Sequence, residues 1–301
     1  MNAQNPGVSI IVPSYNSHET IARSLGSFLR QDYRGEIEII VVDSSPNDFV
    51  ENIIRANFPE IIYFLLKERK LPGAARNFGA ARATSELLIF TDPDIYAPVS
   101  WVKTLVEYYH TNNAVLSGSI LCHNAEWSKI GIHICKFDSW LKAGREREIS
   151  ICPTANMLCR KDVFQKTRNF NETEMLHDAM LSWEMRNNGE RIFFVPEAYV
   201  YHDHTCSIKR FIFERFLRGD DFGRIRSEIS KFGLMTSLFF FVISIFPIRF
   251  LKQYLRIGYH CVISGNTINY ILTTPIILIG VYSWLWGEAR AYTRRIRMQM
   301  T

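Results

Sequence analysis

The chain has 301 residues, of which 47% are apolar and 22% are charged, proportions that exclude an intrinsically disordered protein. The net charge of +5 is unevenly distributed, because residues 207–301 carry 14 Lys or Arg against 5 Asp or Glu, whereas residues 1–206 carry 21 against 25. A basic, aromatic-rich C-terminal part is typical of proteins that bind nucleic acid or an anionic membrane surface.

The first third of the chain alternates short apolar runs with amphipathic segments. Buried strands are predicted at residues 8–12, 37–42, 61–66 and 87–90, and helices at residues 17–30, around 53–54 and at 74–84. This alternation, with connections of turn length, indicates βαβ units. It therefore predicts an α/β fold with a mostly parallel central sheet flanked by helices.

The apolar run at residues 87–90 ends in two carboxylates that are one residue apart, Asp92 and Asp94, with Pro93 between them. In open α/β sheets, ligands bind beyond the carboxyl ends of the strands. Carboxylates there suit a divalent cation that is shared with substrate phosphates. Alternatively, both residues cap a following helix that begins near Pro98. The residue types alone leave both interpretations open.

The pattern is less regular beyond this acidic pair. We expect a helix at residues 101–110, a strand at 115–121, irregular structure at 122–150, helical segments at 163–164 and 180–187, and a strand at 191–195.

The sequence becomes strongly apolar from about residue 233. Residues 232–251 and 268–287 are candidate membrane segments, and Trp284 and Trp286 lie near one end of the second, as in an interfacial aromatic belt. Arg290, Arg294, Arg295 and Arg297 follow, as expected of a cytoplasmic end. The pattern favours membrane attachment over a buried helical hairpin or a dimer interface. It does not decide between helices that span the bilayer and helices that lie in its interface.

Seven motifs then occur in a distinctive order, at residues 8–16, 41–45, 73–80, 90–94, 156–164, 177–178 and 195–202. In this order they resemble the family 2 glycosyltransferases of GT-A fold, over about residues 8–202. The resemblance implies a Rossmann-like GT-A catalytic domain at residues 1–220. Its nucleotide-sugar half would cover about residues 1–120 and its acceptor half about 121–220, before C-terminal membrane-associated helices at 221–301.

The resemblance also implies a reaction. It is an inverting transfer from a nucleotide-diphosphate sugar, with UDP weakly favoured, to an acceptor hydroxyl, assisted by Mg²⁺ or Mn²⁺ at an Asp-x-Asp motif. The Gln-x-x-Arg-Trp motif of processive synthases is absent after His202, so we expect transfer of a single sugar. The apolar C-terminal part points to a lipid-linked or other glycan acceptor at a membrane, with the catalytic domain facing the cytoplasm. Consistent with that location, residues 1–7 are polar and show no secretory signal pattern.

Site residues are carried over position by position. For the donor, the resemblance places Pro13, Tyr15 and Asn16 at the nucleoside, Asp43 at the base, and Gly73 and Arg76 near the phosphates. It places Asp94 and His202 at the metal, with Asp92 beside them and near the ribose or a metal-bound water. Asp178 would be the general base. Four of these residues have a structural alternative. Asp43 would cap a turn, Arg76 would lie on a helix surface, His202 would be structural, and Asp178 would be a helix N-terminal acid.

One departure from the family pattern stands beside the expected base. The usual Glu-Asp pair is replaced by His177-Asp178, and the sequence does not indicate what His177 changes.

Two other function classes compete with this interpretation. A nucleotidyltransferase would carry a Gly-rich basic loop near residues 13–16, and none is present. A catalytically inactive membrane-bound scaffold would not need to retain Asp43, Asp92, Asp94 and Asp178 together. Nucleic-acid binding is disfavoured because the C-terminal aromatic residues stand in continuous apolar runs, apart from the basic residues.

Overall fold

The computed structural model describes residues 5–300, and the chain divides into two compact units. Unit 1 comprises Met1–His123 and Gly144–Asp203, and unit 2 comprises Asn124–Ala143 and His204–Thr301. The expected domain boundary between residues 220 and 221 falls inside helix α8 (Ile208–Ile229). The compact units therefore do not coincide with the domains expected from the sequence.

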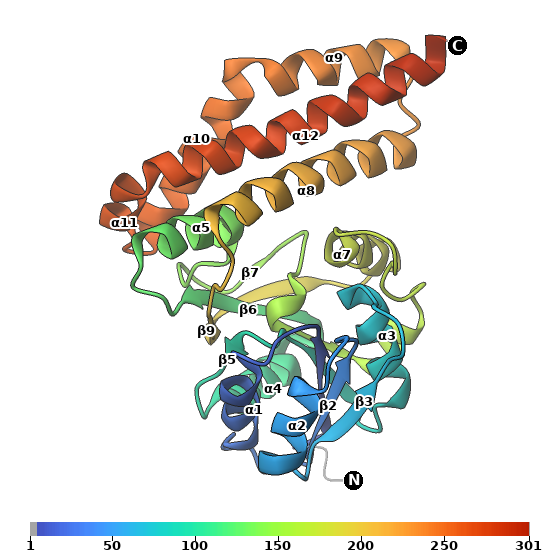
Figure 1. Ribbon diagram of the computed structural model, residues 1–301, viewed down its shortest axis with the longest axis vertical. Coiled ribbons are helices and arrows are strands. Elements are labelled where there is room, and N and C mark those ends of the chain that lie inside the picture. Colours follow the sequence, from blue (N-terminus) through green and yellow to red (C-terminus); the bar gives the residue numbers. More distant parts are fainter. Residues whose placement is uncertain (1–4, 301) are drawn as a thin grey trace. The chain divides into compact units, whose positions relative to one another are not determined.

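Unit 1 is built on one mixed sheet (Figure 1). Its strands are β1 (Val8–Ser14), β2 (Ile37–Asp43), β3 (Ile62–Leu65), β4 (Leu87–Phe90), β5 (Ile95–Tyr96), β6 (Val115–Cys122), β7 (Arg147–Glu148), β8 (Met157–Arg160) and β9 (Ile192–His202). They lie in the order β3-β2-β1-β4-β8-β6-β9-β5, with β7 paired to β9. The neighbours β3, β2, β1 and β4 are all parallel, as predicted, and β8 introduces antiparallel pairing.

Helices flank this sheet, as expected for an α/β fold. They are α1 (Ile21–Leu29), α2 (Phe49–Asn57), α3 (Pro72–Arg82), α4 (Trp101–Asn112), α6 (Lys161–Gln165) and α7 (His177–Asn187). Helix α1 forms because Ile21, Leu25 and Phe28 recur at helical spacing, and all three are fully buried. Helix α3 lies close to the sheet at Gly79, where a Cβ atom would come within 2.7 Å of the Ile11 side chain.

One core of unit 1 lies between α3, α6 and α7 and the sheet. Its fully buried members include Ile11, Ile40, Val42, Leu88, Phe90 and Met157. The Phe90 ring packs edge-on against Phe170, with centroids 4.9 Å apart. This packing holds the segment before α7 against the end of β4.

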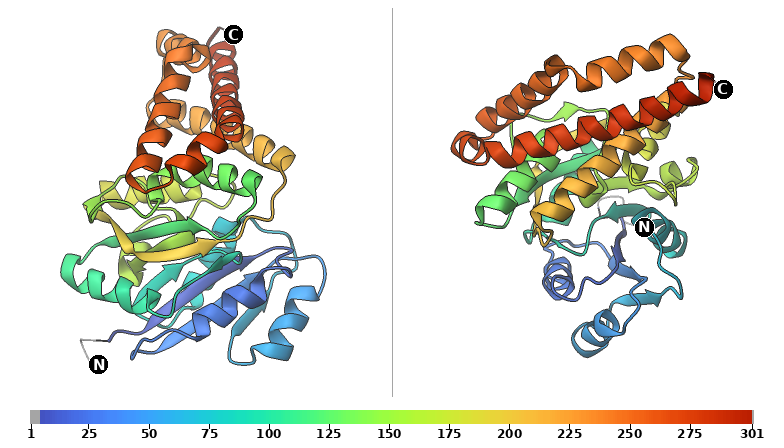
Figure 2. Two further views of the ribbon diagram at one scale, coloured as in Figure 1. Left: turned by 90° about the vertical axis from the view of Figure 1, so that its left-hand side faces the viewer. Right: turned by 45° about the horizontal axis from the view of Figure 1, so that its top comes forward.

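Unit 2 is helical. It contains α5 (Trp127–Phe137), the 3₁₀ turn η1 (Asp138–Trp140), α8, α9 (Leu234–Ile245), α10 (Pro247–Ile263), α11 (Thr267–Leu272) and α12 (Thr274–Met300). Helices α8 and α12 run side by side (Figure 2). Their close approach depends on glycines, because a Cβ atom at Gly219 would meet the backbone of Trp284, and one at Gly287 would meet the backbone of Phe216.

The expectation of irregular structure at residues 122–150 is wrong for α5. The buried face of this helix includes Ile132 and Ile134, which share a core with Ile276, Ile277 and Val281 of α12. This packing stabilises α5, whose buried face also carries the polar His133.

Both candidate membrane segments are interrupted. The first is divided between α9 and α10 at Pro247, and the second between α11 and α12 at Thr273. In residues 5–300, no individual helix combines the length and the apolar character that crossing a bilayer requires. Among these residues, only α9 and α10 taken together reach that length and apolar character, and the chain bends by 61° between the two helices.

Candidate active site

The carboxyl ends of three adjacent parallel strands meet at one edge of the unit 1 sheet. Ser14 at the end of β1 lies opposite Asp43 at the end of β2, and β4 pairs with β1 on its other side. The topology therefore brings together the segments that follow β1, β2 and β4. This is the edge at which open α/β sheets bind ligands.

Asp43 is fully buried and organises this edge. Its Oδ1 accepts hydrogen bonds from the Ser45 amide (3.2 Å) and hydroxyl (2.7 Å), and its Oδ2 accepts one from the Tyr63 hydroxyl at 3.0 Å. Burial, and then the charge of Asp43, raise the pKa of Tyr63, so its hydroxyl remains a donor. The Ser45 hydroxyl accepts a bond from the Asn16 amide at 2.7 Å. Asp43 thus links the segment after β2 to the segment after β1.

The three residues expected at the nucleoside differ in exposure. Pro13 is buried within β1, whereas Tyr15 and Asn16 are exposed beyond the strand end. Asn16 adopts a left-handed backbone conformation (φ 53°), which asparagine tolerates better than most residues. The Arg69 guanidinium lies 4.5 Å from the centre of the Tyr15 ring. An aromatic face and a cation are therefore presented together at this edge.

Arg76 is buried on α3, with 2% of its surface exposed, so the alternative of a helix-surface arginine is wrong. Its Nη2 donates to Asp92, and its Nη1 lies 3.4 Å from Nε2 of His177. The guanidinium also lies 5.8 Å from the centre of the Phe170 ring. Gly73, one turn earlier, allows the chain near Asn171 to approach, because a Cβ atom there would collide with the Asn171 carbonyl.

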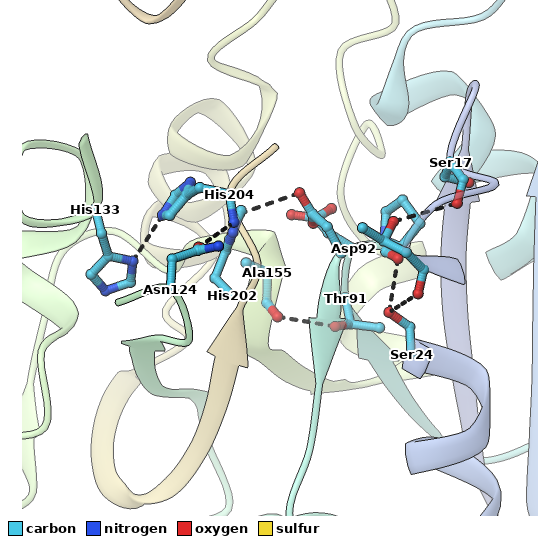
Figure 3. A network of polar contacts seen from close by, with 12 residues as sticks. Ser17, Ser24, Thr91, Asp92, Asn124, His133, Ala155, His202 and His204 are labelled. Atoms are coloured by element: carbon cyan, nitrogen blue, oxygen red, sulfur yellow. Dashed lines mark hydrogen bonds and ion pairs between the residues drawn. The ribbon is translucent and has the colours of Figure 1, made fainter. Parts of the chain in front are cut away.

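The acidic turn after β4 is held from several sides. Ser24 of α1 donates to the Pro93 carbonyl at 2.8 Å, and Thr91 donates to the Ala155 carbonyl at 3.1 Å (Figure 3). Helix α4 begins after Ser100, which is its N-cap, so the alternative in which Asp92 and Asp94 cap that helix is wrong.

Asp94 and His202 face one another across two paired strands. Ile95 of β5 lies opposite His202 of β9, and the Asp203 amide donates to the Asp94 carbonyl at 2.8 Å. This register places Nε2 of His202 3.7 Å from Oδ2 of Asp94. In residues 5–300, no group of three or more His, Cys, Asp or Glu is arranged to hold a metal ion. One carboxylate and one imidazole fit a cation whose remaining ligands are phosphate oxygens and water.

Asp178 and His177 form the first turn of α7. The Asp178 side chain is half-buried, and its Oδ1 accepts a hydrogen bond from the Ala179 amide at 2.8 Å. His177 is buried against Arg76 and edge-on to Phe170, with ring centroids 5.5 Å apart. His177, whose role the sequence left unexplained, therefore connects α7 to Arg76, and through Arg76 to Asp92.

A neighbouring cluster of side chains was not predicted. The Arg23 guanidinium lies 3.9 Å from the centre of the Tyr96 ring and 3.7 Å from the Asp203 carboxylate. Tyr96 also hydrogen-bonds His123 and stacks on Tyr201, with centroids 5.0 Å apart. Only the positions of Tyr96 and Asp203, close in sequence to Asp94 and His202, could have indicated this cluster.

In unit 2, a buried pair of imidazoles was also not predicted. Nδ1 of His133 lies 2.9 Å from Nε2 of His204, and the His204 amide donates to the Asn124 side chain at 2.8 Å (Figure 3). Both rings are almost fully buried.

Comparison with known proteins shows which sequences and folds the chain resembles. The chain is 25% identical over 225 residues to the "Pre-mycofactocin glycosyltransferase" of Mycobacterium tuberculosis, covering 70% of this chain and 46% of that protein. It is 26% identical over 195 residues to "Glycosyltransferase AglE" of Haloferax volcanii, covering 62% of each. The chain therefore spans about half to two thirds of the length of these relatives.

Solved structures show the same fold. The mannosyltransferase PcManGT from Pyrobaculum calidifontis, in complex with GDP-Man and Mn²⁺, matches with a TM-score of 0.58 and 16% identity, over 91% of this chain and 87% of that chain. S. aureus TarS matches with a TM-score of 0.54 and 22% identity, over 71% and 39%. The sequence model "Glycosyl transferase family 2" matches residues 9–168, more than half of the chain. The chain therefore belongs to glycosyl transferase family 2.

Proposed function

We propose that this enzyme transfers a single sugar, with inversion, from a nucleotide-diphosphate sugar to an acceptor hydroxyl, and that Asp178 is the general base. The observation that carries the proposal is the series of contacts from Asp92 through Arg76 to His177. It ties the acidic turn, on the donor side, to the helix end that bears Asp178. A base and a donor site fixed to one another are what a single displacement requires.

On the donor side, Tyr15 and Asn16 would bind the nucleoside, and the buried Asp43, expected at the base, would act on it through Ser45, which holds Asn16. A UDP-sugar is the first donor to test. Gly73 and Arg76 would lie near the diphosphate. Asp94 and His202, with Asp92 beside them, would hold Mg²⁺ or Mn²⁺ together with that diphosphate. The bound cation would neutralise charge on the departing nucleoside diphosphate. Two structural neighbours support a cation of this kind, since PcManGT was solved with GDP-Man and Mn²⁺, and GalNAc-T7 with UDP, GalNAc and Mn²⁺.

On the acceptor side, the acceptor oxygen forms a bond to the anomeric carbon as the bond from that carbon to the phosphate oxygen breaks. The proton of the acceptor hydroxyl passes to the Asp178 carboxylate. Asp178 lies in the first turn of α7, and its Oδ1 accepts a hydrogen bond from the Ala179 amide. A carboxylate that is ionised at neutral pH is suited to accept this proton.

The acceptor proposed is lipid-linked or another glycan, at a membrane whose cytoplasmic side the catalytic unit faces. A Campylobacter jejuni relative, 28% identical over 120 residues, is named "GalNAc(5)-diNAcBac-PP-undecaprenol beta-1,3-glucosyltransferase". Its name describes an acceptor of this class. The apolar, basic C-terminal part of the present chain is a second reason to place the reaction at a membrane.

The base is tested with Asp178→Asn, assayed with a panel of donors and with lipid-linked and water-soluble acceptors. General base catalysis contributes about 10²- to 10⁴-fold, so we expect kcat to fall by roughly that factor while donor affinity is retained. The matched control is Asp48→Asn, at an exposed position on the same unit. A kcat of Asp178→Asn equal to that of the wild type would exclude Asp178 as the base. If the wild type itself binds donor but turns over none of the acceptors, the result would instead favour an inactive scaffold.

A further inference from the structure

Unit 2 contains an apolar groove at the corner between α9 and α10. Its volume is about 290 Å³. The groove is lined by Ile245, Phe246 and Phe250 from the α9–α10 corner and by Tyr282, Leu285 and Trp286 from α12. Leu285 is buried at its base, whereas the Tyr282 and Trp286 side chains are more than half exposed at its rim. The groove is small for a whole drug-sized ligand, but its volume and apolar lining suit part of an apolar chain.

The groove is a built feature of the fold. Pro247 begins α10, and Phe246 before it has an extended backbone, which separates the two helices by 61°. A buried ion pair then fixes the corner to α12. Arg249 donates to Glu288 at 2.7 Å and to the hydroxyl of Ser244, which also lines the groove, at 3.0 Å. Glu288 is fully buried, so the corner is anchored independently of any ligand.

The groove opens onto an unusually apolar surface. Exposed side chains on α9 include Met235, Phe239 and Val242, and those on α10 form a stripe at helical spacing, namely Ile248, Leu251, Leu255, Tyr259 and Val262. Contiguous apolar surface of this extent marks a binding surface. The groove and the stripe share the α9–α10 corner, so we treat them as parts of one surface.

The charges beside the stripe identify what covers it. Lys252 and Arg256 lie one turn apart on α10 and are both exposed, although Arg256 also pairs with Asp138 at 3.2 Å. An apolar stripe bordered by basic residues is the pattern of a helix that lies in the plane of an anionic membrane. A two-fold pairing with a second copy would instead place the basic residues of both copies side by side. The Tyr282 and Trp286 rings at the rim stack on one another, 6.3 Å apart, and are residues typical of the membrane interface.

We propose that this groove binds a stretch of one hydrocarbon chain of a membrane lipid while α9 and α10 lie in the interface of an anionic membrane. The inference rests on the proposed function in one respect, because a lipid-linked acceptor would supply such a chain. The polyprenyl chain of an acceptor and the acyl chain of a phospholipid share this chemistry.

The test uses the full chain with phosphatidylcholine vesicles that contain or lack phosphatidylglycerol. Each vesicle preparation carries a photoactivatable group on either a polyprenyl phosphate or a phospholipid acyl chain. We expect binding that requires phosphatidylglycerol and weakens with salt, and crosslinks that map to residues 244–250 and 282–286. Labelling by the polyprenyl probe alone identifies the acceptor chain as the occupant, and labelling by both probes identifies any membrane lipid chain.

The variant Phe246→Asp places a carboxylate at the groove, and we expect it to lower vesicle partitioning by about tenfold or more. Phe49→Asp is the matched control, because Phe49 is 53% exposed on unit 1 and Phe246 is 51% exposed. Trp286→Ala provides a second test at the rim if Phe246→Asp does not fold. Vesicle binding without crosslinks at the groove, or stable dimers that do not bind vesicles, would overturn the inference. Donor turnover by the wild type on a water-soluble acceptor is measured separately, so a failure of the proposed function is distinguishable.

Discussion

Arg76 connects more of the candidate site than any other single side chain described above. It is buried on α3, donates to Asp92 and contacts His177 and Phe170. A planar guanidinium can reach two partners on different elements at once, whereas a lysine ammonium on its flexible stem acts as a point charge. The position therefore requires the shape of arginine as well as its charge.

We predict that Arg76→Lys destabilises the fold by roughly 1–3 kcal/mol, because one buried partner is left without its donor. It should also weaken donor binding. Urea unfolding and donor titration measure the two effects. Arg34→Lys, at an exposed position on the same unit, is the control and should change the free energy of unfolding by less than about 0.5 kcal/mol. Equal effects of the two substitutions would show that the Arg76 contacts do not matter.

Glu38 of β2 gives a pH-dependent prediction. Its Oε1 accepts hydrogen bonds from the Ser9 hydroxyl and from the amides of Thr84 and Ser85, at 2.5 and 3.1 Å. Burial acts to raise the pKa of Glu38, but these hydrogen bonds together hold it below its ordinary value. The stabilisation is therefore fully present above the unfolded-state pKa of about 4.3, and it is lost as the pH falls through the lower pKa of the folded state.

We accordingly expect Glu38→Gln to be less stable than the wild type at pH 7 and to lose less stability on acidification below about pH 4. Glu36→Gln, at an exposed position two residues earlier, should leave the acid dependence unchanged. Unfolding midpoints in urea across this pH range provide the measurement. Parallel pH profiles for the wild type and Glu38→Gln would refute the assignment.

For the individual residues of the candidate site, the sequence predicted the residue types better than it predicted their burial and contacts. The motif order located Asp43, Asp92, Asp94 and Asp178, but it left open whether Arg76 was buried and what His177 contacts. Both answers depend on the approach of the segment around Phe170 to α3, which is set by packing between residues about 100 positions apart. Local sequence carries no signal for such a contact.

At the scale of elements, the packing of α8 on α12 depends on small residues. We predict that Gly287→Ala lowers stability by roughly 1–3 kcal/mol, because the new Cβ would collide with the Phe216 carbonyl and force the helices apart. Gly26→Ala in α1 is the control, since a Cβ there would meet only the end of the flexible Arg30 side chain. Higher helix propensity should make that change neutral or stabilising. Thermal unfolding distinguishes the two, and a neutral Gly287→Ala would contradict this packing.

The elements that sequence reasoning predicted well are those with a strong local pattern. Strands β1, β2 and β4 are short runs dominated by Val, Ile and Leu, and α1 has a clear helical period. By contrast, α5 was missed because its apolar face packs against C-terminal helices that are distant in the sequence. In the segment at residues 232–251, only Pro247 indicated that the helix would be interrupted. The high apolar content of these residues instead suggested one continuous helix.

At the scale of the whole molecule, the α/β character and the family could be predicted, but the division into units could not. Residues 124–143 lie between two parts of unit 1 in sequence and yet belong with the C-terminal helices. That assignment depends on contacts of α5 with α8, α11 and α12, which no local pattern reveals. Strand order and the antiparallel insertion of β8 are likewise set by long-range pairing.

The central claim is that the sheet edge formed by β1, β2 and β4 binds a nucleotide-diphosphate sugar together with a divalent cation. Calorimetric titration of the wild type with UDP- and GDP-sugars, with and without Mn²⁺, tests it most directly. We expect binding of at least one donor that depends on Mn²⁺ and is weakened about tenfold or more in Asp94→Asn, but not in the control Asp48→Asn. Absence of binding by every donor, or unchanged Mn²⁺ dependence in Asp94→Asn, would contradict the account.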